Sequence, residues 1–92
     1  MKRALITIGC TREYIDPVRY ISNESSGRQG IALIKSLLKF NYKVICLHGY
    51  LQTKKIVSKN VKFIFTPTAD EMLKEAKKYK SIDLGIFNAA VS

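Results

Sequence analysis

The sequence predicts an α/β fold in which short buried strands of a parallel sheet alternate with amphipathic helices. Two observations support this prediction. Continuous apolar runs of about five residues are typical of strands covered on both faces, and apolar residues at helical spacing fall between such runs. With 92 residues, of which 47% are hydrophobic and 25% charged, the chain is expected to form one small or partial domain over residues 1–92.

The first strand and the first helix are the clearest elements. Ala4–Ile8 reads ALITI and precedes Gly9, which predicts a buried strand that ends there. Residues 30–40, GIALIKSLLKF, predict a helix that packs on the sheet, and Asn41 is expected to end it. The apolar face of this helix consists of Ile31, Ile34, Leu37 and Leu38.

Three further strands follow. Residues 43–47 (KVICL), 61–65 (VKFIF) and 83–88 (DLGIFN) have the apolar character of sheet strands. The polar and basic stretch 50–60 is interpreted as a loop with a short helical turn. With right-handed crossovers, this order of elements predicts a Rossmann-like, doubly wound sheet of about four parallel strands with flanking helices, truncated relative to larger members of that class.

A second helix is expected between the last two strands. Thr68 and Glu71 have the spacing of a capping box, in which the threonine side chain caps the first turn. Lysines near the predicted carboxyl end suit the helix dipole. The expected apolar face is Ala69, Met72, Leu73, Ala76 and Tyr79.

The long connection from Gly9 to about Ser25 is the unusual feature. Connections in α/β units usually have about two to six residues, so this one is expected to be functional. Small residues before a helix let backbone N–H groups approach phosphate oxygens. The alternative is an ordinary loop rich in turn formers. Ligands of such sheets bind beyond the carboxyl ends of the strands, where Gly9, His48-Gly49 and residues 88–90 are expected to meet.

Familiar nucleotide and metal motifs are absent from the sequence. The first turn has one glycine, Gly9, where a dinucleotide fold has G-x-G-x-x-G, and no Walker sequence is present. Cys10 and Cys46 are too far apart for a metal motif, and His48 is the only histidine, so no metal site is expected. Both thiols are expected to be reduced. Cys46 is expected in the core, and for Cys10 a packing or loop role is favoured over a role as a nucleophile.

The net charge of +9, from 16 Lys and Arg against 7 Asp and Glu, would suit a polyanion. Lysines of the second half, however, occur singly or in pairs without interleaved aromatics, which favours a solvated surface over nucleic-acid binding. No apolar run reaches the roughly 18 residues of a membrane helix. The short basic start resembles a strand more than a signal peptide, so a cytoplasmic location and no membrane partner are expected.

Residues of the long connection resemble a known family. Thr11-Arg12-Glu13, the run IDPVRYISN at 15–23, Ser25-Ser26-Gly27 and Gly30 are similar to the signature TRE-x-IDPVRYISN-x-SSG-x-x-G of phosphopantothenoylcysteine synthetases. These are the ligase part of the bacterial coenzyme A flavoprotein family. The similarity continues through TADEM at 68–72 and NAAVS at 88–92. It implies the amino-terminal part of such a ligase.

The resemblance implies a reaction and its residues. CTP, with Mg²⁺ as its counter-ion, would activate 4′-phosphopantothenate as an acyl-cytidylate, and the cysteine amine would displace CMP. Asn23 matches the asparagine that holds the acyl-nucleotide, and Arg19 would bind a phosphate or carboxylate. No flavin is expected in this segment, and a homodimer or a complementing carboxyl-terminal polypeptide is the expected partner. The expected nucleotide- and phosphate-binding residues are Gly9, Thr11, Ser25, Ser26, Gly27, Gly30, Ala89 and Ala90.

Two alternatives of other classes stay open. In the first alternative to the ligase, the chain would be a non-catalytic remnant or nucleotide-binding module without ligase activity. In the second, which is less favoured, it would be a basic nucleic-acid-binding domain. The site residues also have structural interpretations: Asp16-Pro17 as a turn, Arg19 as the ion-pair partner of Asp16 or Glu13, and Asn23 as a helix cap.

Overall fold

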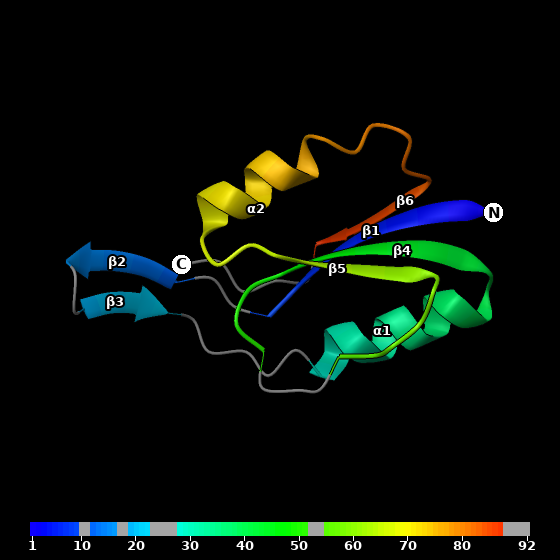
Figure 1. Cartoon of the computed structure of the whole chain (residues 1–92), viewed down its shortest axis with the longest axis horizontal. Helices are drawn as coiled ribbons and strands as arrows, with labels where there is room; N and C mark the ends of the chain where they lie inside the picture. Colours follow the sequence, from blue (N-terminus) through cyan, green and yellow to red (C-terminus); the bar gives the residue numbers. More distant parts are fainter. Residues whose placement is uncertain (10–11, 17–18, 23–27, 52–54, 88–92) are drawn as a thin grey trace.

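The structure is a computed structural model that describes residues 1–9, 12–16, 19–22, 28–51 and 55–87, with backbone alone for 12–16 and 19–22. Its main sheet has four parallel strands in the order β5-β4-β1-β6 (Figure 1). Their bounds are β1 Lys2–Ile8, β4 Tyr42–His48, β5 Val61–Phe65 and β6 Leu84–Phe87. This arrangement confirms the predicted α/β class.

The two helices cover opposite faces of this sheet, as Figure 1 shows. Side chains alternate between the faces along each strand, so neighbouring residues of β4 enter different clusters. Cys46 packs in the cluster that contains Ile34 of α1, whereas Leu47 packs in the cluster that contains Met72 of α2. Double coverage explains why the strand sequences are continuously apolar, and it confirms the predicted doubly wound arrangement.

Helix α1 spans Arg28–Lys39, two residues longer at its start than predicted. Ile31, Ile34 and Leu37 are buried, while Leu38 is partly buried at the rim of the same cluster. Asn41 has φ of 64°, the left-handed conformation that commonly ends helices. The predicted helix stop is therefore confirmed.

Helix α2 spans Ala69–Ala76, and Thr68 caps it as predicted. The Thr68 backbone is extended, and its Oγ1 accepts a hydrogen bond from the Glu71 backbone N at 3.2 Å. One predicted core residue is misplaced, because Leu73 is 55% exposed. A helix of eight residues covers the sheet with a narrow stripe around Met72, and Leu73 lies one helical step, about 100°, away from it.

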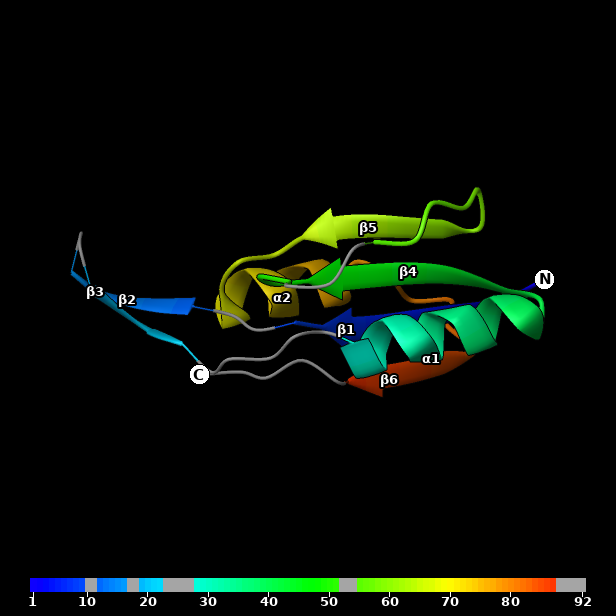
Figure 2. The ribbon, with the colours of Figure 1, turned by 90° about the horizontal axis from the view of Figure 1, so that it is seen from below.

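The connection after β1 differs from the predicted loop. It contains two antiparallel strands, β2 Arg12–Asp16 and β3 Arg19–Ser22, which pair in a separate two-stranded sheet. Figures 1 and 2 show this hairpin extended beyond the carboxyl ends of the main strands. Tyr and Ile pairs on both sides of Asp16-Pro17 favour strands around a turn.

The connection between β4 and β5 also differs in part. A short helical turn was predicted within residues 50–60. The described residues there, 50–51 and 55–60, contain no helix, and residues 59–60 form a turn in which the Val61 N donates to the Ser58 O at 3.4 Å. Tyr50 instead forms an isolated bridge just after β4.

Candidate site at the carboxyl ends of the strands

The carboxyl ends of β1, β4 and β5 form a continuous edge. Ile8 and His48 are register partners, and the Gly49 N donates to the Ile8 O at 3.1 Å. On the other side of β4, the Thr66 N donates to the His48 O at 2.7 Å. The pairing thus extends one residue past the strands and holds Gly9, Gly49 and Thr66 in line at the predicted ligand edge.

Gly9 has a packing requirement of its own. Its φ is +81°, a conformation that disfavours residues with a Cβ. A Cβ added there would lie 2.8 Å from Leu51 Cδ2 and 2.9 Å from the Tyr50 carbonyl oxygen. The chain after β4 therefore lies directly against Gly9. This contact confirms the predicted meeting of Gly9 with the His48-Gly49 end. Packing alone accounts for a glycine at this position, and no ligand has to be invoked to explain it.

His48 is buried within this edge, with 4% of its surface exposed. Its Nδ1 lies 2.9 Å from the Gly49 O, and because a carbonyl oxygen only accepts, Nδ1 carries the proton. Burial is the main cause that lowers the pKa of His48 below its ordinary 6.5, and Lys55 lowers it further against the opposing hydrogen bond to Gly49. The imidazole is consequently neutral at pH 7, with Nε2 as its acceptor.

Thr66 is a site residue that the sequence reasoning missed. It is 1% exposed, and both its backbone N and its Oγ1 donate to the His48 O, the latter at 3.3 Å. A threonine directly after an apolar strand was the available signal. Its side chain fixes the end of β5 against β4 and so sets the position of the aromatic residues nearby.

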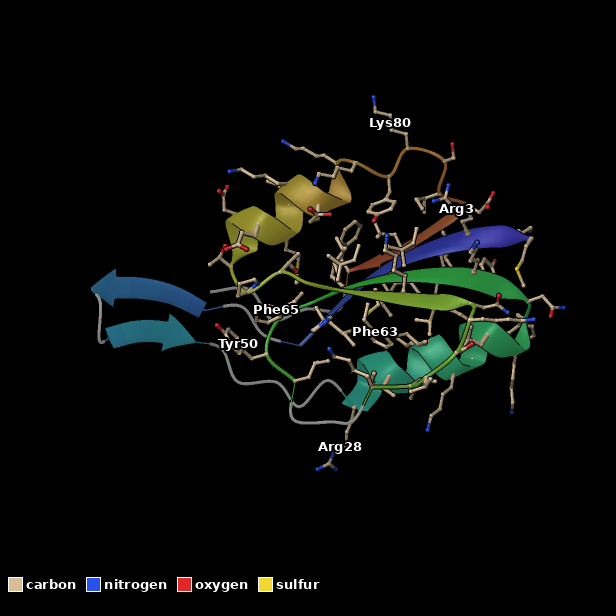
Figure 3. All side chains as sticks on the ribbon, viewed as in Figure 1. Arg3, Arg28, Tyr50, Phe63, Phe65 and Lys80 are labelled. Atoms are coloured by element: carbon tan, nitrogen blue, oxygen red, sulfur yellow. The ribbon has the colours of Figure 1, made fainter. Side chains whose placement is uncertain are left out.

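Four rings follow one another along the β5 side of the edge. The centroid distances are 5.4 Å for Tyr50–Phe65, 5.6 Å for His48–Phe65 and 5.9 Å for His48–Phe63. Lys55 Nζ lies 5.8 Å from the centroid of Phe63. We call these five residues the aromatic strip, of which Figure 3 labels Tyr50, Phe63 and Phe65. Lys55 lies beside Phe63 although no aromatic residue is interleaved with the lysines in the sequence, because the strip joins two separate segments.

The predicted ligand residues divide into described and undescribed ones. Gly30 is buried in the first turn of α1. Arg19 is the first residue of β3 and pairs with Asp16 in the backbone register, while its side chain is outside the described set. The other predicted site residues lie outside the described residues altogether: Thr11, Asn23, Ser25, Ser26, Gly27, Ala89 and Ala90.

Helix α1 directs its amino end toward the same edge. It follows β1 and runs back along the sheet, so its first turn starts near the carboxyl ends of the strands (Figure 2). That turn contains no acidic residue. Backbone N–H groups of a first turn have no acceptor within the helix, and together with the helix dipole they make such an end favourable for an anion, which agrees with the predicted phosphate role of the connection.

The opposite edge of the sheet has a basic cleft of about 520 Å³. Arg3, Lys43, Lys59 and Lys62 are among its lining residues. This cleft lies at the amino ends of the strands, where doubly wound sheets do not place their ligands. It is therefore separate from the candidate site.

Two absences concern the described part of the chain. No group of three or more His, Cys, Asp and Glu side chains there is arranged to hold a metal ion. Among the same residues, no helix is long and apolar enough to cross a membrane. Cys46 is a free, fully buried thiol, and burial raises its pKa to about 12, which fits the predicted core role.

Known proteins resemble the chain along its whole length. Residues 1–92 match the family model described as DNA/pantothenate metabolism flavoprotein C-terminal domain. The coenzyme A biosynthesis bifunctional protein CoaBC of Thermococcus kodakarensis is 41% identical over 95 residues, covering 99% of this chain and 23% of that protein.

Solved structures share the fold. The DNA/pantothenate metabolism flavoprotein from Streptococcus pneumoniae superposes with a TM-score of 0.92 at 28% identity, covering 99% of this chain and 42% of the other. The C-terminal domain of CoaBC superposes with a TM-score of 0.85 at 36% identity, covering 98% of this chain and 45% of the other. The chain thus spans about a quarter of the curated relative and less than half of either solved chain.

Proposed function

Because the chain belongs to the family of DNA/pantothenate metabolism flavoprotein C-terminal domains, we propose that it forms the amino-terminal part of a phosphopantothenate–cysteine ligase. The observation that carries this proposal is the match of all 92 residues to the family, which includes the run from Thr11 to Gly30. The reaction belongs to coenzyme A biosynthesis, and we place it in the cytoplasm.

The proposed reaction has two steps. The carboxylate of 4′-phosphopantothenate attacks the α-phosphorus of CTP, so that pyrophosphate leaves and an acyl-cytidylate forms. The amine of cysteine then attacks the acyl carbon, an amide bond forms, CMP leaves, and the amine loses a proton. Positioning and charge neutralisation supply most of the catalysis in such transfers. CTP enters as its Mg²⁺ complex, and no flavin takes part in this segment.

Residue roles follow the family pattern. Asn23 would hold the acyl-cytidylate, because a neutral amide orients an oxyanion without competing as a nucleophile. Arg19 would bind a phosphate or carboxylate in two-pronged fashion. The triphosphate would lie on Gly9, Thr11, Ser25, Ser26, Gly27 and Gly30, and the base on Ala89 and Ala90.

The amino end of α1 supports the triphosphate role. Gly30 is buried in a first turn without acidic residues, and this turn starts near the carboxyl end of β1 (Figure 2). The positive φ of Gly9 turns the chain away from β1 toward the connection. Backbone N–H groups are therefore concentrated where the phosphates would lie.

The β6 edge supports a partner that completes the domain. Among the described residues, β6 pairs with β1 alone, and Phe87 is 75% exposed. An apolar, unpaired edge strand favours the addition of a further strand. A complementing carboxyl-terminal polypeptide would cover this edge, since the solved relatives are more than twice as long in sequence as the part that matches.

The hairpin β2–β3 supports a homodimer. An isolated two-stranded hairpin is marginally stable in water, and this one extends away from the main sheet (Figure 2). A second copy of the complemented chain would stabilise it. Since Arg19 is the first residue of β3, dimerisation would also stabilise the strand that carries this proposed site residue.

Calorimetry with Mg²⁺·CTP tests the proposal and separates it from a non-catalytic module. The titration uses the chain alone and the chain mixed with a polypeptide that carries the remainder of the solved CoaBC C-terminal domain. Binding that appears or strengthens with the second polypeptide supports the ligase. When 4′-phosphopantothenate and cysteine are then added, Asn23→Ala should slow formation of the amide product without preventing folding. Equal binding in both states favours a nucleotide-binding module, and no binding in either state contradicts both.

A further inference from the structure

The aromatic strip has no role in the ligase proposed above. The bases of that ligase would lie at Ala89 and Ala90, which follow β6, whereas the strip follows β4 and β5. Strands β5 and β6 are separated by β4 and β1, and three spacings of about 4.8 Å put the two edges roughly 14 Å apart. One base cannot contact both places, so the strip needs its own explanation.

The strip combines accessible rings with a cation. Phe65 is 54% exposed, Tyr50 and Phe63 are half-buried, and His48 is buried beside Phe63 and Phe65. Figure 3 shows Tyr50 and Phe65 close together near the carboxyl end of β5, with Phe63 nearer to α1. Large apolar rings at an open sheet edge are unfavourable in water unless something covers them.

The charge of Lys55 indicates which kind of ligand would cover the rings of the aromatic strip. Within the described part of the chain, Lys55 has no carboxylate at ion-pair distance, although it lies beside the ring of Phe63. An anion with flat, apolar faces is complementary to both the rings and the lysine.

We propose that the aromatic strip binds nucleobases, which stack on Phe65 and Tyr50, with the attached phosphate at Lys55. Base stacking on aromatic side chains beside a cation is how proteins bind single strands without sequence preference. A single strand of RNA or DNA offers several bases in succession and a free nucleotide offers one. This inference is independent of the ligase, because its residues are not part of the proposed ligase site.

The neutral state of His48 fits this role. Its Nδ1 is occupied by the Gly49 O, and no described group lies within hydrogen-bond distance of Nε2. A neutral imidazole adds uncharged ring surface next to Phe65, which is the exposed ring of that pair. The strip therefore presents stacking surface, and the charge of the site comes from Lys55.

The test measures binding of fluorescein-labelled decauridylate to the full chain by anisotropy at low salt, with UMP and a DNA duplex as competitors. Phe65→Leu keeps an apolar side chain and removes the ring, so we expect affinity to fall about 5- to 100-fold. Lys55→Gln should weaken binding and reduce its salt dependence. The matched controls are Phe40→Leu, at a phenylalanine that is 76% exposed on another surface, and Lys80→Gln, which Figure 3 places far from the strip.

Competition by UMP identifies a free nucleotide as the ligand, and binding of decauridylate without such competition identifies a single strand. Either result supports the proposal if Phe65→Leu weakens the binding of decauridylate and Phe40→Leu does not. The proposal is overturned by three results: no binding at low salt, unchanged binding by Phe65→Leu, or a duplex that binds as tightly as the single strand. Circular dichroism of each variant establishes that it is folded.

Discussion

Substitution of Gly9 tests how the candidate site is built. Gly9→Ala puts a Cβ on a residue with φ of +81°, which costs roughly 1–2 kcal/mol for an L-residue. The new atom also lies 2.8 Å from Leu51 Cδ2 and 2.9 Å from the Tyr50 O, and overpacking of this kind costs about 1–3 kcal/mol. We therefore expect the free energy of unfolding to fall by about 2–5 kcal/mol.

Urea unfolding followed by circular dichroism measures this loss, and Gly85→Ala is the matched control. At Gly85 a Cβ would meet only Phe87 Cε2 at 3.6 Å, an ordinary contact, so the change should be within about 0.5 kcal/mol. The reasoning is refuted if Gly9→Ala is as stable as Gly85→Ala.

The two components of the Gly9 effect are separable. Leu51→Ala removes the side-chain clash and leaves both the backbone clash with Tyr50 and the positive φ. In a double-mutant cycle, Leu51→Ala should therefore recover only part of the loss caused by Gly9→Ala. Full recovery would show that the backbone conformation of Gly9 contributes nothing, contrary to the structure.

Three other predictions concern single side chains. Because the pKa of His48 is lowered in the folded protein, the unfolded state binds more protons just below pH 6.5. The free energy of unfolding should therefore fall as pH drops through that region. His48→Gln, which removes the only histidine, should flatten this dependence of stability on pH. A profile that rises toward acid would contradict this sign. The thiol of Cys46, with a pKa of about 12, should resist iodoacetamide at pH 8 in a Cys10→Ser variant until urea unfolds the chain; rapid labelling of the folded state would refute its burial. Thr68→Ala should cost about 1 kcal/mol by removing the cap of α2, whereas Thr68→Ser should retain most of the stability.

Local chemistry explains which elements could be predicted from the sequence. The apolar runs of β1 and β4, the stop at Asn41 and the cap at Thr68 each depend on residues that are close in the chain. The exposure of Leu73 could not be predicted in this way, because it depends on how narrow a stripe a short helix places on the sheet. The doubly wound order followed from general handedness rules once the elements were correct.

The missed features have identifiable causes. The hairpin β2–β3 had a local signal in its Tyr and Ile pairs, but the many turn formers around it favoured a loop. The aromatic strip had no local signal beyond Phe63 and Phe65, since Tyr50 and Lys55 come from a segment that only the folded chain brings alongside β5. The packing of Leu51 against Gly9 could not be predicted, because it is a tertiary contact between the ends of two strands.

Formation of product tests the central proposal most directly. The chain and the polypeptide carrying the remainder of the CoaBC C-terminal domain are mixed with 4′-phosphopantothenate, cysteine and Mg²⁺·CTP, and the products are followed by mass spectrometry. The proposal predicts phosphopantothenoylcysteine and CMP in equal amounts, with neither polypeptide active alone and Asn23→Ala strongly impaired. A complex that assembles and binds CTP but forms no amide product would contradict the ligase function.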